Sequence, residues 1–383
     1  MVLKISKKQA RDHLTGQLGL RQTTPYGAGS TLELLERLRC VQLDPLDVVG
    51  TNADLVAMAR IDGMRRGDIH RHLHPGSAFE HFAKERCVLP AEAFPYYRER
   101  MKRKPDWRLS KRLRGVPETL LAQVLDEVRR RGPLGPRDFG AGGAVARGTG
   151  SAWSSNARMT TLALEVLCRR CQLVVCGRPG GGKLYDLPHR ALGEWATAPA
   201  AEFGRWALLE RVEAAGLLSR TSGPWWSAIK AERTSGLVEA LIEERHIEEV
   251  AVEGSSRRSL APRGFLERSF PEQDDRLRIL GPLDPLVWNR KLVQHAFDFE
   301  YVWEVYKPAH KRRWGWYVCP ILHRGLLVGR LEARVRDGVL VVDGLWTQGG
   351  LWEVAALDGA LEAHALACGA STYRRPERPA PNP

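Results

Sequence analysis

A carboxamide and a carboxylate lie two positions apart near the N-terminus, in the stretch VQLDPL at residues 41–46. The Gln42 amide can both donate and accept hydrogen bonds. An accessible Asp44 is ionised at neutral pH, and a carboxylate can accept a proton or face a developing positive charge. The two groups could therefore act on one reacting atom, provided that the chain turns both side chains the same way.

The local pattern is compatible with that arrangement. Alternate side chains of an extended segment share a face, and Pro45 pushes the residue before it toward extended geometry. Val41 and Leu43 would then point into a core, while Gln42 and Asp44 point together into a cleft. The alternative is a helix end followed by an Asp-Pro turn, with Gln42 hydrogen-bonded locally, and by spacing alone this alternative is the commoner case.

An internal repeat predicts the scaffold that must position these residues. Residues 165–188 and 239–262 align without a gap at an offset of 74 residues. Each runs from the end of an apolar-periodic helix into a short strand, a basic Gly- or Ser-rich turn, and a second short stretch that closes on Pro. A helix followed by a hairpin with a basic tip is the second half of a winged helix. The front halves agree, because residues 117–132 and 201–220 place apolar side chains on one helical face.

These patterns predict a mixed α+β chain of tandem winged-helix domains followed by a β-barrel-like domain. Short β-rich runs punctuated by Gly and Pro begin near residue 276 and suggest a small barrel or curled sheet, with a helix at 351–369 after it. The length of 383 residues suggests two to four domains. The expected divisions are 1–105 (winged helix with the Gln-Asp pair), 106–192 and 198–270 (further winged helices), 276–370 (β-barrel-like) and 371–383 (a Pro- and Arg-rich tail that cannot pack).

The charge balance indicates a polyanionic partner. The chain has 58 Lys and Arg against 45 Asp and Glu, a net charge of +13, and tandem winged helices on a basic chain most often bind duplex DNA. A genome rich in Arg codons is the other source of such a charge. The expected DNA-binding residues lie in the basic stretch 98–115, at the hairpin tips and in KRRWGWY at 311–317; they are Arg103, Lys104, Arg108, Lys111, Arg112, Lys183, Arg257, Arg258, Arg312 and Arg313.

Membrane, secreted and metal-binding classes are not favoured. The sequence has no run of 18 apolar residues, and its first 25 residues lack the apolar segment of a secretory signal. We therefore expect a cytoplasmic, nucleoid-associated protein. Seven cysteines without a regular framework fit reduced thiols. Cys168, Cys171 and Cys176 have no second pair of ligands at zinc spacing, so no metal site is expected.

An ordered set of motifs resembles the winged-helix DNA glycosylases of the AlkZ/YcaQ family, which includes interstrand-crosslink repair enzymes. The set spans roughly residues 5–345. It comprises the Gln-x-Asp-Pro of Gln42 and Asp44, FEHF followed by Leu-Pro, GPLGPRDF, KLYDLP, GPLDPLVWNR and YKPAHKRRWGWYVCPIL. Members of the family carry either Gln-x-Gln or Gln-x-Asp at this position, and with Gln-x-Asp the chain resembles the YcaQ-like branch. Relatives tend to read FEYW and then His where this chain has His81, Phe82 and Lys84, and Met64 stands where an aromatic residue is common.

The resemblance implies three tandem winged helices plus a barrel, and an enzyme that hydrolyses the N-glycosidic bond of N7-alkylated guanine in bulky monoadducts and interstrand crosslinks. Alkylation makes the base cationic, so it leaves as a neutral group without a general acid. Asp44 would stabilise the oxocarbenium-like sugar and activate water, and Gln42 would hold that water or the sugar-phosphate. Glu80 and His81, in an expected helix, would support the site or form a structural pair.

The same resemblance implies no metal or organic cofactor. No lysine is singled out as a Schiff-base nucleophile, so we expect a monofunctional glycosylase that acts as a monomer on duplex DNA. A crosslinked guanine cannot swing out freely, which implies an open cleft with limited base flipping. The main alternative is a non-catalytic winged-helix transcriptional regulator, which gives the Gln-Asp pair no role. A nuclease is disfavoured because no carboxylate cluster has metal-site spacing.

Overall fold

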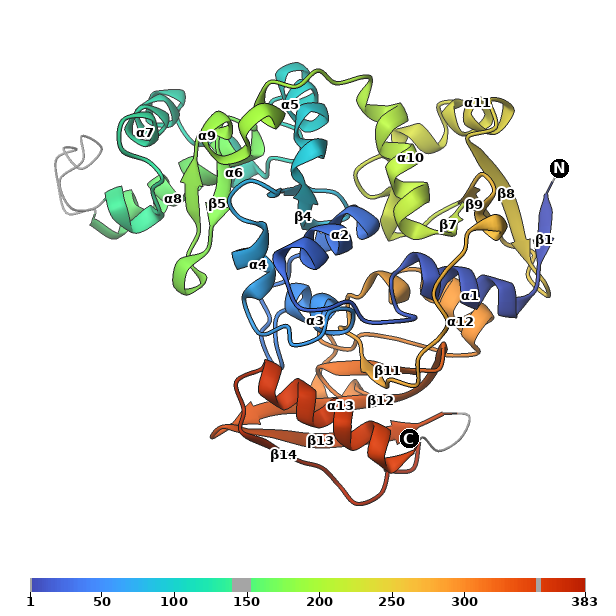
Figure 1. Cartoon of the computed structure of the whole chain (residues 1–383). Coiled ribbons are helices and arrows are strands. Elements are labelled where there is room, and N and C mark those ends of the chain that lie inside the picture. Colours follow the sequence, from blue (N-terminus) through green and yellow to red (C-terminus); the bar gives the residue numbers. More distant parts are fainter. Residues whose placement is uncertain (1, 140–152, 349–352, 383) are drawn as a thin grey trace. The chain divides into compact units, whose positions relative to one another are not determined.

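The computed structural model describes residues 2–139, 153–348 and 353–382, in which the chain forms two compact units (Figure 1). Unit 1 comprises residues 1–69, 83–87 and 207–383, and unit 2 comprises residues 70–82 and 88–206. Each unit contains both helices and strands, so the expected mixed α+β class is confirmed. No helix of the described ranges is long and apolar enough to cross a membrane.

Unit 1 contains most of the strands. Its helices are α1 (Lys7–Gln17), α2 (Ala28–Leu38), α3 (Asn52–Met58), α11 (Leu237–Glu243), α12 (Arg290–Phe297) and α13 (Val354–Ala367), and its strands are β1 (Leu3–Ile5), β2 (Val41–Gln42), β7 (Leu218–Ser219), β8 (Ile247–Val252), β9 (Arg258–Pro262), β10 (Arg278–Ile279), β11 (Val318–His323), β12 (Leu326–Arg336), β13 (Val339–Thr347) and β14 (Thr372–Arg374).

Unit 2 is mainly helical. Its elements are β3 (Ala78–Phe82), α5 (Phe94–Arg103), α6 (Lys111–Arg114), α7 (Glu118–Arg131), α8 (Trp153–Arg169), β5 (Val174–Gly177), β6 (Leu184–Asp186) and α9 (Pro188–Leu192). Three elements continue from one unit into the other; they are α4 (Asp68–Leu73), β4 (Arg86–Pro90) and α10 (Phe203–Ala215).

A five-stranded sheet forms the C-terminal part of unit 1, in the order β10-β11-β12-β13-β14. Its register shifts at Ile321/Leu322 and at Glu332/Ala333, and such irregularities bend and twist a sheet. The helix α13 packs against it through Leu357, Leu361 and Ala365 (Figure 1). This is the curled sheet and following helix expected after residue 276; residues 351 and 352 of the expected helix lie outside the described residues.

The C-terminal tail packs, contrary to the expectation for residues 371–383. Strand β14 pairs in parallel with β13, Arg375 contacts Asp358 at 2.6 Å, and the Ala380 N–H donates to the Leu345 carbonyl at 2.7 Å. Composition misleads here because the backbone of β13 offers a sheet edge, and edge pairing needs hydrogen-bonding backbone groups more than apolar side chains.

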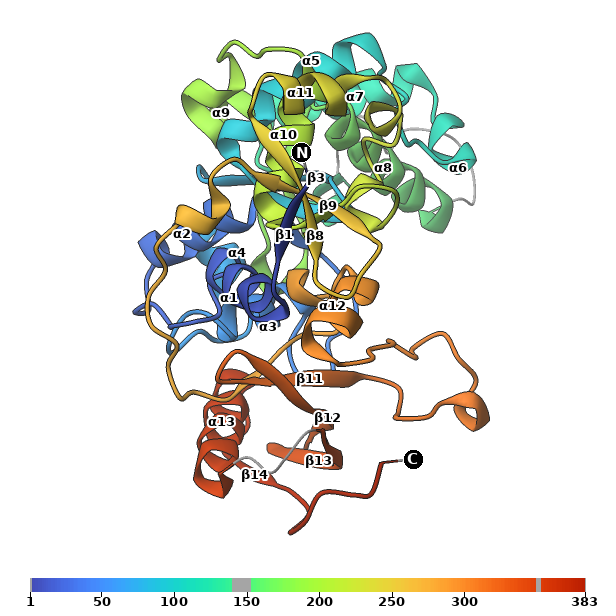
Figure 2. The same cartoon turned by 90° about the vertical axis from the view of Figure 1, so that its right-hand side faces the viewer.

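Both halves of the sequence repeat contain a helix followed by an antiparallel hairpin. In unit 2 α8 leads into β5 and β6, and in unit 1 α11 leads into β8 and β9. Figure 2 shows β8 beside β1. The order β1-β8-β9-β7 therefore enlarges the second hairpin into a four-stranded sheet.

The order of helices and strands agrees with the expected winged helices. That these segments are winged-helix domains, and that the chain has four domains, stay predictions. The first expected domain, residues 1–105, contributes 1–69 and 83–87 to unit 1 and the rest to unit 2.

Candidate active site

The segment that carries Gln42 leaves helix α2 abruptly. α2 buries Leu34, Leu35 and Leu38 on one face, and it ends at Arg39 in the left-handed conformation (φ 58°). Val41 is then fully buried and begins β2. The Leu43 N–H donates to the Arg86 carbonyl at 2.8 Å, so the extended backbone continues past β2. The extended geometry expected around Gln42 is confirmed.

Gln42 is held at both its backbone and its side chain. The residue is only 7% exposed. Its backbone carbonyl accepts a hydrogen bond from Asn52 Nδ2 at 2.9 Å, and Asn52 is itself fixed at the start of α3 after the Thr51 cap. Its side-chain Oε1 accepts from Lys84 Nζ at 2.6 Å. Gln42 is therefore a buried, oriented group rather than a polar residue on the surface.

Asp44 lies at the edge of the same segment and is partly exposed. Its Oδ1 accepts the Leu46 N–H at 3.0 Å, which is the local turn foreseen in the alternative interpretation. Burial raises the pKa of Tyr317, and Cys319, Asp44, Asp47 and Asp54 raise it further, so the Asp44 carboxylate acts electrostatically on the Tyr317 ring. Within the described residues no hydrogen bond joins Gln42 to Asp44. The predicted convergence of the two side chains stays a prediction.

Lys84 links Gln42 to a cavity. It follows β3 in the sequence, belongs to unit 1 and places its ammonium 4.5 Å from the Trp288 ring centroid. Burial lowers the pKa of Lys84 to about 8. The residue also lines an open cavity of about 450 Å³. A half-buried cation with a lowered pKa, hydrogen-bonded to Gln42 and lining a cavity, is a common feature of functional sites.

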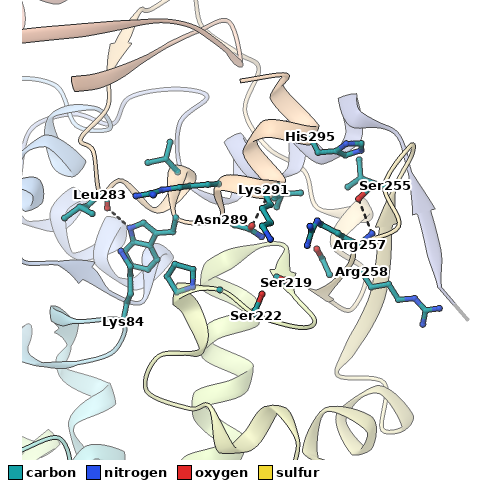
Figure 3. Close-up of a pocket in the computed structure, with 18 of the residues that line it drawn as sticks. Lys84, Ser219, Ser222, Ser255, Arg257, Arg258, Leu283, Asn289, Lys291 and His295 are labelled. Carbon is teal, nitrogen blue, oxygen red and sulfur yellow. Dashed lines mark hydrogen bonds between the residues drawn. The ribbon is translucent and has the colours of Figure 1, made fainter. Parts of the chain in front are cut away.

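The cavity is basic and partly aromatic (Figure 3). Lys84 lies at one end, and Arg257 and Arg258 from the hairpin β8–β9 lie at the other. Among the described residues that line it there is no Asp or Glu. Apolar residues such as Leu283 and Val287 also line the cavity. Other lining residues carry hydroxyl, amide or basic groups; they are Ser219, Ser222, Ser255, Ser259, Asn289, Arg290, Lys291 and His295. Such a lining suits a phosphate-bearing ligand with an apolar face.

Buried polar and aromatic contacts hold Trp288, the aromatic residue that lines the cavity. Trp288 Nε1 donates to the Leu283 carbonyl at 2.6 Å, and the Trp288 ring packs on Trp225 with 4.3 Å between centroids. Asp284 is completely buried and pairs with Arg60 through contacts of 2.7 and 3.0 Å. Asp284 is therefore held in a buried ion pair, which is a structural role.

The expected DNA-binding residues divide between the two units, with four in unit 1 and six in unit 2. Arg257 and Arg258 line the basic cavity, and Arg312 and Arg313 line a second cavity of about 500 Å³ together with Trp314 and Trp316. The unit 2 group comprises Arg103, Lys104, Arg108, Lys111, Arg112 and Lys183.

Two members of the unit 2 group already have local contacts. The Arg108 guanidinium lies over the Phe82 ring at 5.1 Å, and Lys183 Nζ is 3.8 Å from Glu80. The remaining four, Arg103, Lys104, Lys111 and Arg112, are exposed. Their role in DNA binding stays a prediction.

Glu80 and His81 lie on strand β3, so the helix expected there is wrong. The alternation of FEHF is a strand pattern, and both side chains are buried. Glu80 pairs with Arg178 at 2.6 Å. His81 Nε2 contacts the Arg169 carbonyl at 2.9 Å, and its ring stacks on Trp107 with an interplanar angle of 6°. These contacts lie within unit 2 and match the structural pair that was the alternative to a supporting role.

Sequence analysis missed the residues that connect Gln42 to the cavity. Lys84 was noticed only as a departure from the family pattern, and Trp288, Asn289 and Arg290 only as part of GPLDPLVWNR. The end of that motif could have indicated a site, because an aromatic residue, an amide and a cation directly follow an apolar run.

Comparisons with known proteins agree with this architecture. The family model described as DNA glycosylase AlkZ-like matches residues 35–367. The fold is similar to that of the Streptomyces sahachiroi DNA glycosylase AlkZ, with a TM-score of 0.65 and 18% sequence identity over 98% of this chain and 100% of that chain. At this identity the structural likeness shows the fold, while the family match covers most of the chain. The chain therefore belongs to the AlkZ-like family of DNA glycosylases.

Proposed function

We propose that this protein is a monofunctional DNA glycosylase that removes N7-alkylated guanine, in bulky monoadducts and interstrand crosslinks, from duplex DNA. It would act as a monomer in the cytoplasm without a metal in its chemistry. The observation that supports the proposal most is the hydrogen bond from Lys84 to Gln42, because Lys84 also lines a basic cavity whose described lining residues include Trp288 and no Asp or Glu.

The contact with Lys84 supports one role for Gln42. An ammonium has donors only, so the carboxamide oxygen is taken up by Lys84 and the amide nitrogen keeps its two N–H groups for the substrate. Those donors suit a water lone pair, a sugar oxygen or a phosphate oxygen. Gln42 is therefore assigned the role of a donor that positions the nucleotide or the attacking water.

Asp44 would supply the negative charge. One carboxylate oxygen is held by the Leu46 N–H, which fixes the group, and the side chain remains partly exposed. A carboxylate fixed in this way can face the oxocarbenium-like sugar and orient or deprotonate water at C1′. The cationic alkylated guanine leaves as a neutral base, so a second carboxyl group acting as an acid is not required.

The basic cavity would hold the DNA backbone. Phosphate contacts fix the register of a protein on a duplex and do not depend on sequence, which suits an enzyme that must act wherever damage occurs. Arg257 from the β8–β9 hairpin and Lys291 from α12 both line the cavity and lie near one another in Figure 3, so together they can neutralise phosphate groups. The Trp288 face offers an apolar platform for a sugar or base.

The proposal is tested by incubating the protein with duplexes that contain 7-methylguanine or a nitrogen-mustard crosslink. The expected products are free alkylguanine and an abasic strand that stays intact until alkali is added. Strand cleavage without alkali would contradict monofunctional hydrolysis. Tight, salt-dependent binding to undamaged DNA without release of any N7 adduct would favour the transcriptional regulator instead.

A further inference from the structure

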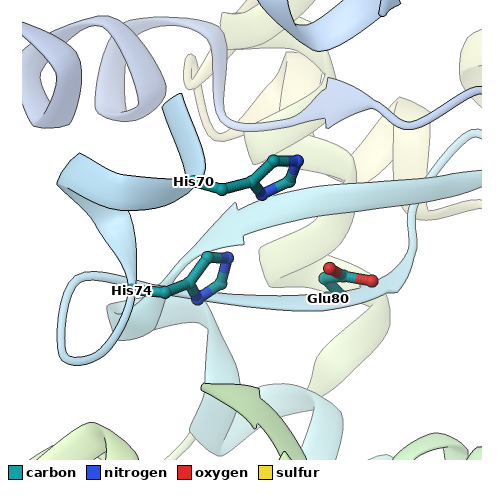
Figure 4. A group of neighbouring side chains, drawn as sticks. All are labelled: His70, His74 and Glu80. Carbon is teal, nitrogen blue, oxygen red and sulfur yellow. The ribbon is translucent and has the colours of Figure 1, made fainter. Parts of the chain in front are cut away.

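Three potential metal ligands lie together in unit 2, and the proposed glycosylase chemistry uses none of them. They are His70 and His74, four positions apart at the end of α4, and Glu80 on β3. One ligand atom from each residue lies within 4.8 Å of the others. Figure 4 shows both imidazole rings on the side of the helix that faces the Glu80 carboxylate.

The two histidines lack the hydrogen bonds that buried imidazoles usually make. His74 is 7% exposed, and neither of its ring nitrogens makes a hydrogen bond of good geometry, although the Ala78 backbone comes close enough to act on its pKa as a weak hydrogen-bond partner. The Nδ1 atom of His70 is also buried without a partner. Most buried polar atoms in proteins are hydrogen-bonded, and an exception needs an explanation such as an unseen ion.

Imidazole binds a metal through an unprotonated ring nitrogen, and histidine nitrogen is a common zinc ligand. The two rings are nearly parallel, with an interplanar angle of 17° and 5.8 Å between centroids. A nitrogen of each ring can therefore face the same ion.

We propose that His70, His74 and Glu80 bind one Zn²⁺ ion. Two imidazole nitrogens and one carboxylate oxygen are a ligand set that zinc accepts, and a water molecule would complete the tetrahedron. Mg²⁺ and Ca²⁺ are disfavoured because they prefer oxygen ligands. None of the three residues takes part in the chemistry assigned to Gln42, Asp44 and Lys84, so the ion would act by fastening the end of α4 to β3, with one position left open to water.

The neighbouring cations limit the affinity but do not block the site. Arg178 contacts Oε1 of Glu80 at 2.6 Å, and Lys183 lies 3.8 Å from Oε2. A carboxylate can bind a metal through one oxygen while the other accepts a hydrogen bond, and such outer contacts orient ligands. Glu165, 3.7 Å from Lys183, offsets part of the positive charge. We therefore expect weaker binding than at a closed four-ligand site.

The test measures zinc in the full-length protein without a histidine tag. Equilibrium dialysis against Zn²⁺ followed by elemental analysis should give one ion per chain for the wild type. His74→Ala should lower zinc affinity at least about 100-fold, since loss of an outer-shell partner alone costs 10- to 100-fold. His72→Ala is the matched control, because this histidine is on the same helix but outside the cluster.

Two further readouts separate binding from misfolding. Co²⁺ added to the wild type and to His72→Ala should give the visible absorption of a four-coordinate ion, and Zn²⁺ should abolish it. Zn²⁺ should also raise the melting temperature of the wild type but not that of a folded Glu80→Gln variant. Equal zinc content in the wild type and His74→Ala, or no zinc bound by the wild type, would overturn the proposal.

Discussion

Replacing Lys84 by Met should remove a pH dependence of stability that the wild type shows above pH 8. Burial lowers the pKa of Lys84 from 10.5 to about 8, so the folded protein gives up this proton more readily than the unfolded chain does. Between these two values the unfolded state binds more protons, and the unfolding free energy rises with pH. Below pH 8 both states carry the proton and the desolvation cost is constant.

The size of the effect follows from the shift. One pKa unit corresponds to about 1.4 kcal/mol, so the full difference is roughly 3 kcal/mol, and about 2 kcal/mol of it should appear between about pH 7.5 and pH 9.5. Urea denaturation at both pH values measures it as a change in midpoint at constant slope. The unfolding free energy of the wild type should rise by about 2 kcal/mol relative to Lys84→Met over this range.

Lys84→Arg is the matched control, because its guanidinium keeps its charge throughout this range. The two variants should therefore show the same pH dependence as each other, whatever their absolute stabilities. If the wild type and Lys84→Met changed in parallel from pH 7.5 to pH 9.5, the inferred burial of a charged Lys84 beside Gln42 would be wrong.

Three further results are expected. Asp284→Asn should lower the unfolding free energy by about 3–5 kcal/mol in urea denaturation, since it leaves the guanidinium of Arg60, 2% exposed, without its counter-charge; a loss below about 1 kcal/mol would show that the pair relaxes. Gln42→Ala should slow single-turnover base release about 10- to 100-fold, because substrate positioning is lost, while leaving DNA affinity nearly unchanged, and an unchanged rate would remove Gln42 from the site. Arg257→Ala should weaken binding to all duplexes alike and reduce the salt slope by about 1 in anisotropy titrations, whereas a sequence-selective loss would exclude a phosphate contact.

Local sequence patterns predicted the helices and strands better than they predicted which strands pair with one another. The helix-hairpin order was visible at an offset of 74 residues because turn and strand signals are local. The parallel pairing of β1 with β8, which joins Leu3 to Val250, was not predicted. The pairing of the tail with β13 was missed for the same reason, since both depend on sheet edges that form only when distant segments meet.

The candidate site shows the same division. Extended geometry at Gln42 followed from its neighbours and is confirmed, whereas the contact with Lys84 spans 42 positions and could not be predicted from local patterns. The four-residue spacing of His70 and His74 is readable in the sequence, but their approach to Glu80 depends on β3, a strand that was expected to be a helix. Convergence of Asp44 with Gln42 depends on how the chain turns at Pro45, which spacing does not determine.

The most direct test of the proposed function is the rate of base release from 7-methylguanine DNA under single-turnover conditions, with the wild type compared with Asp44→Asn. Asn keeps the size of the side chain and can still accept the Leu46 N–H, so the turn at residue 44 should survive. The account predicts nearly equal DNA affinity and a rate lower by about 100- to 1,000-fold, the usual cost of losing a charge-stabilising or general-base group. Base release at the wild-type rate by a folded, DNA-bound Asp44→Asn variant would contradict it.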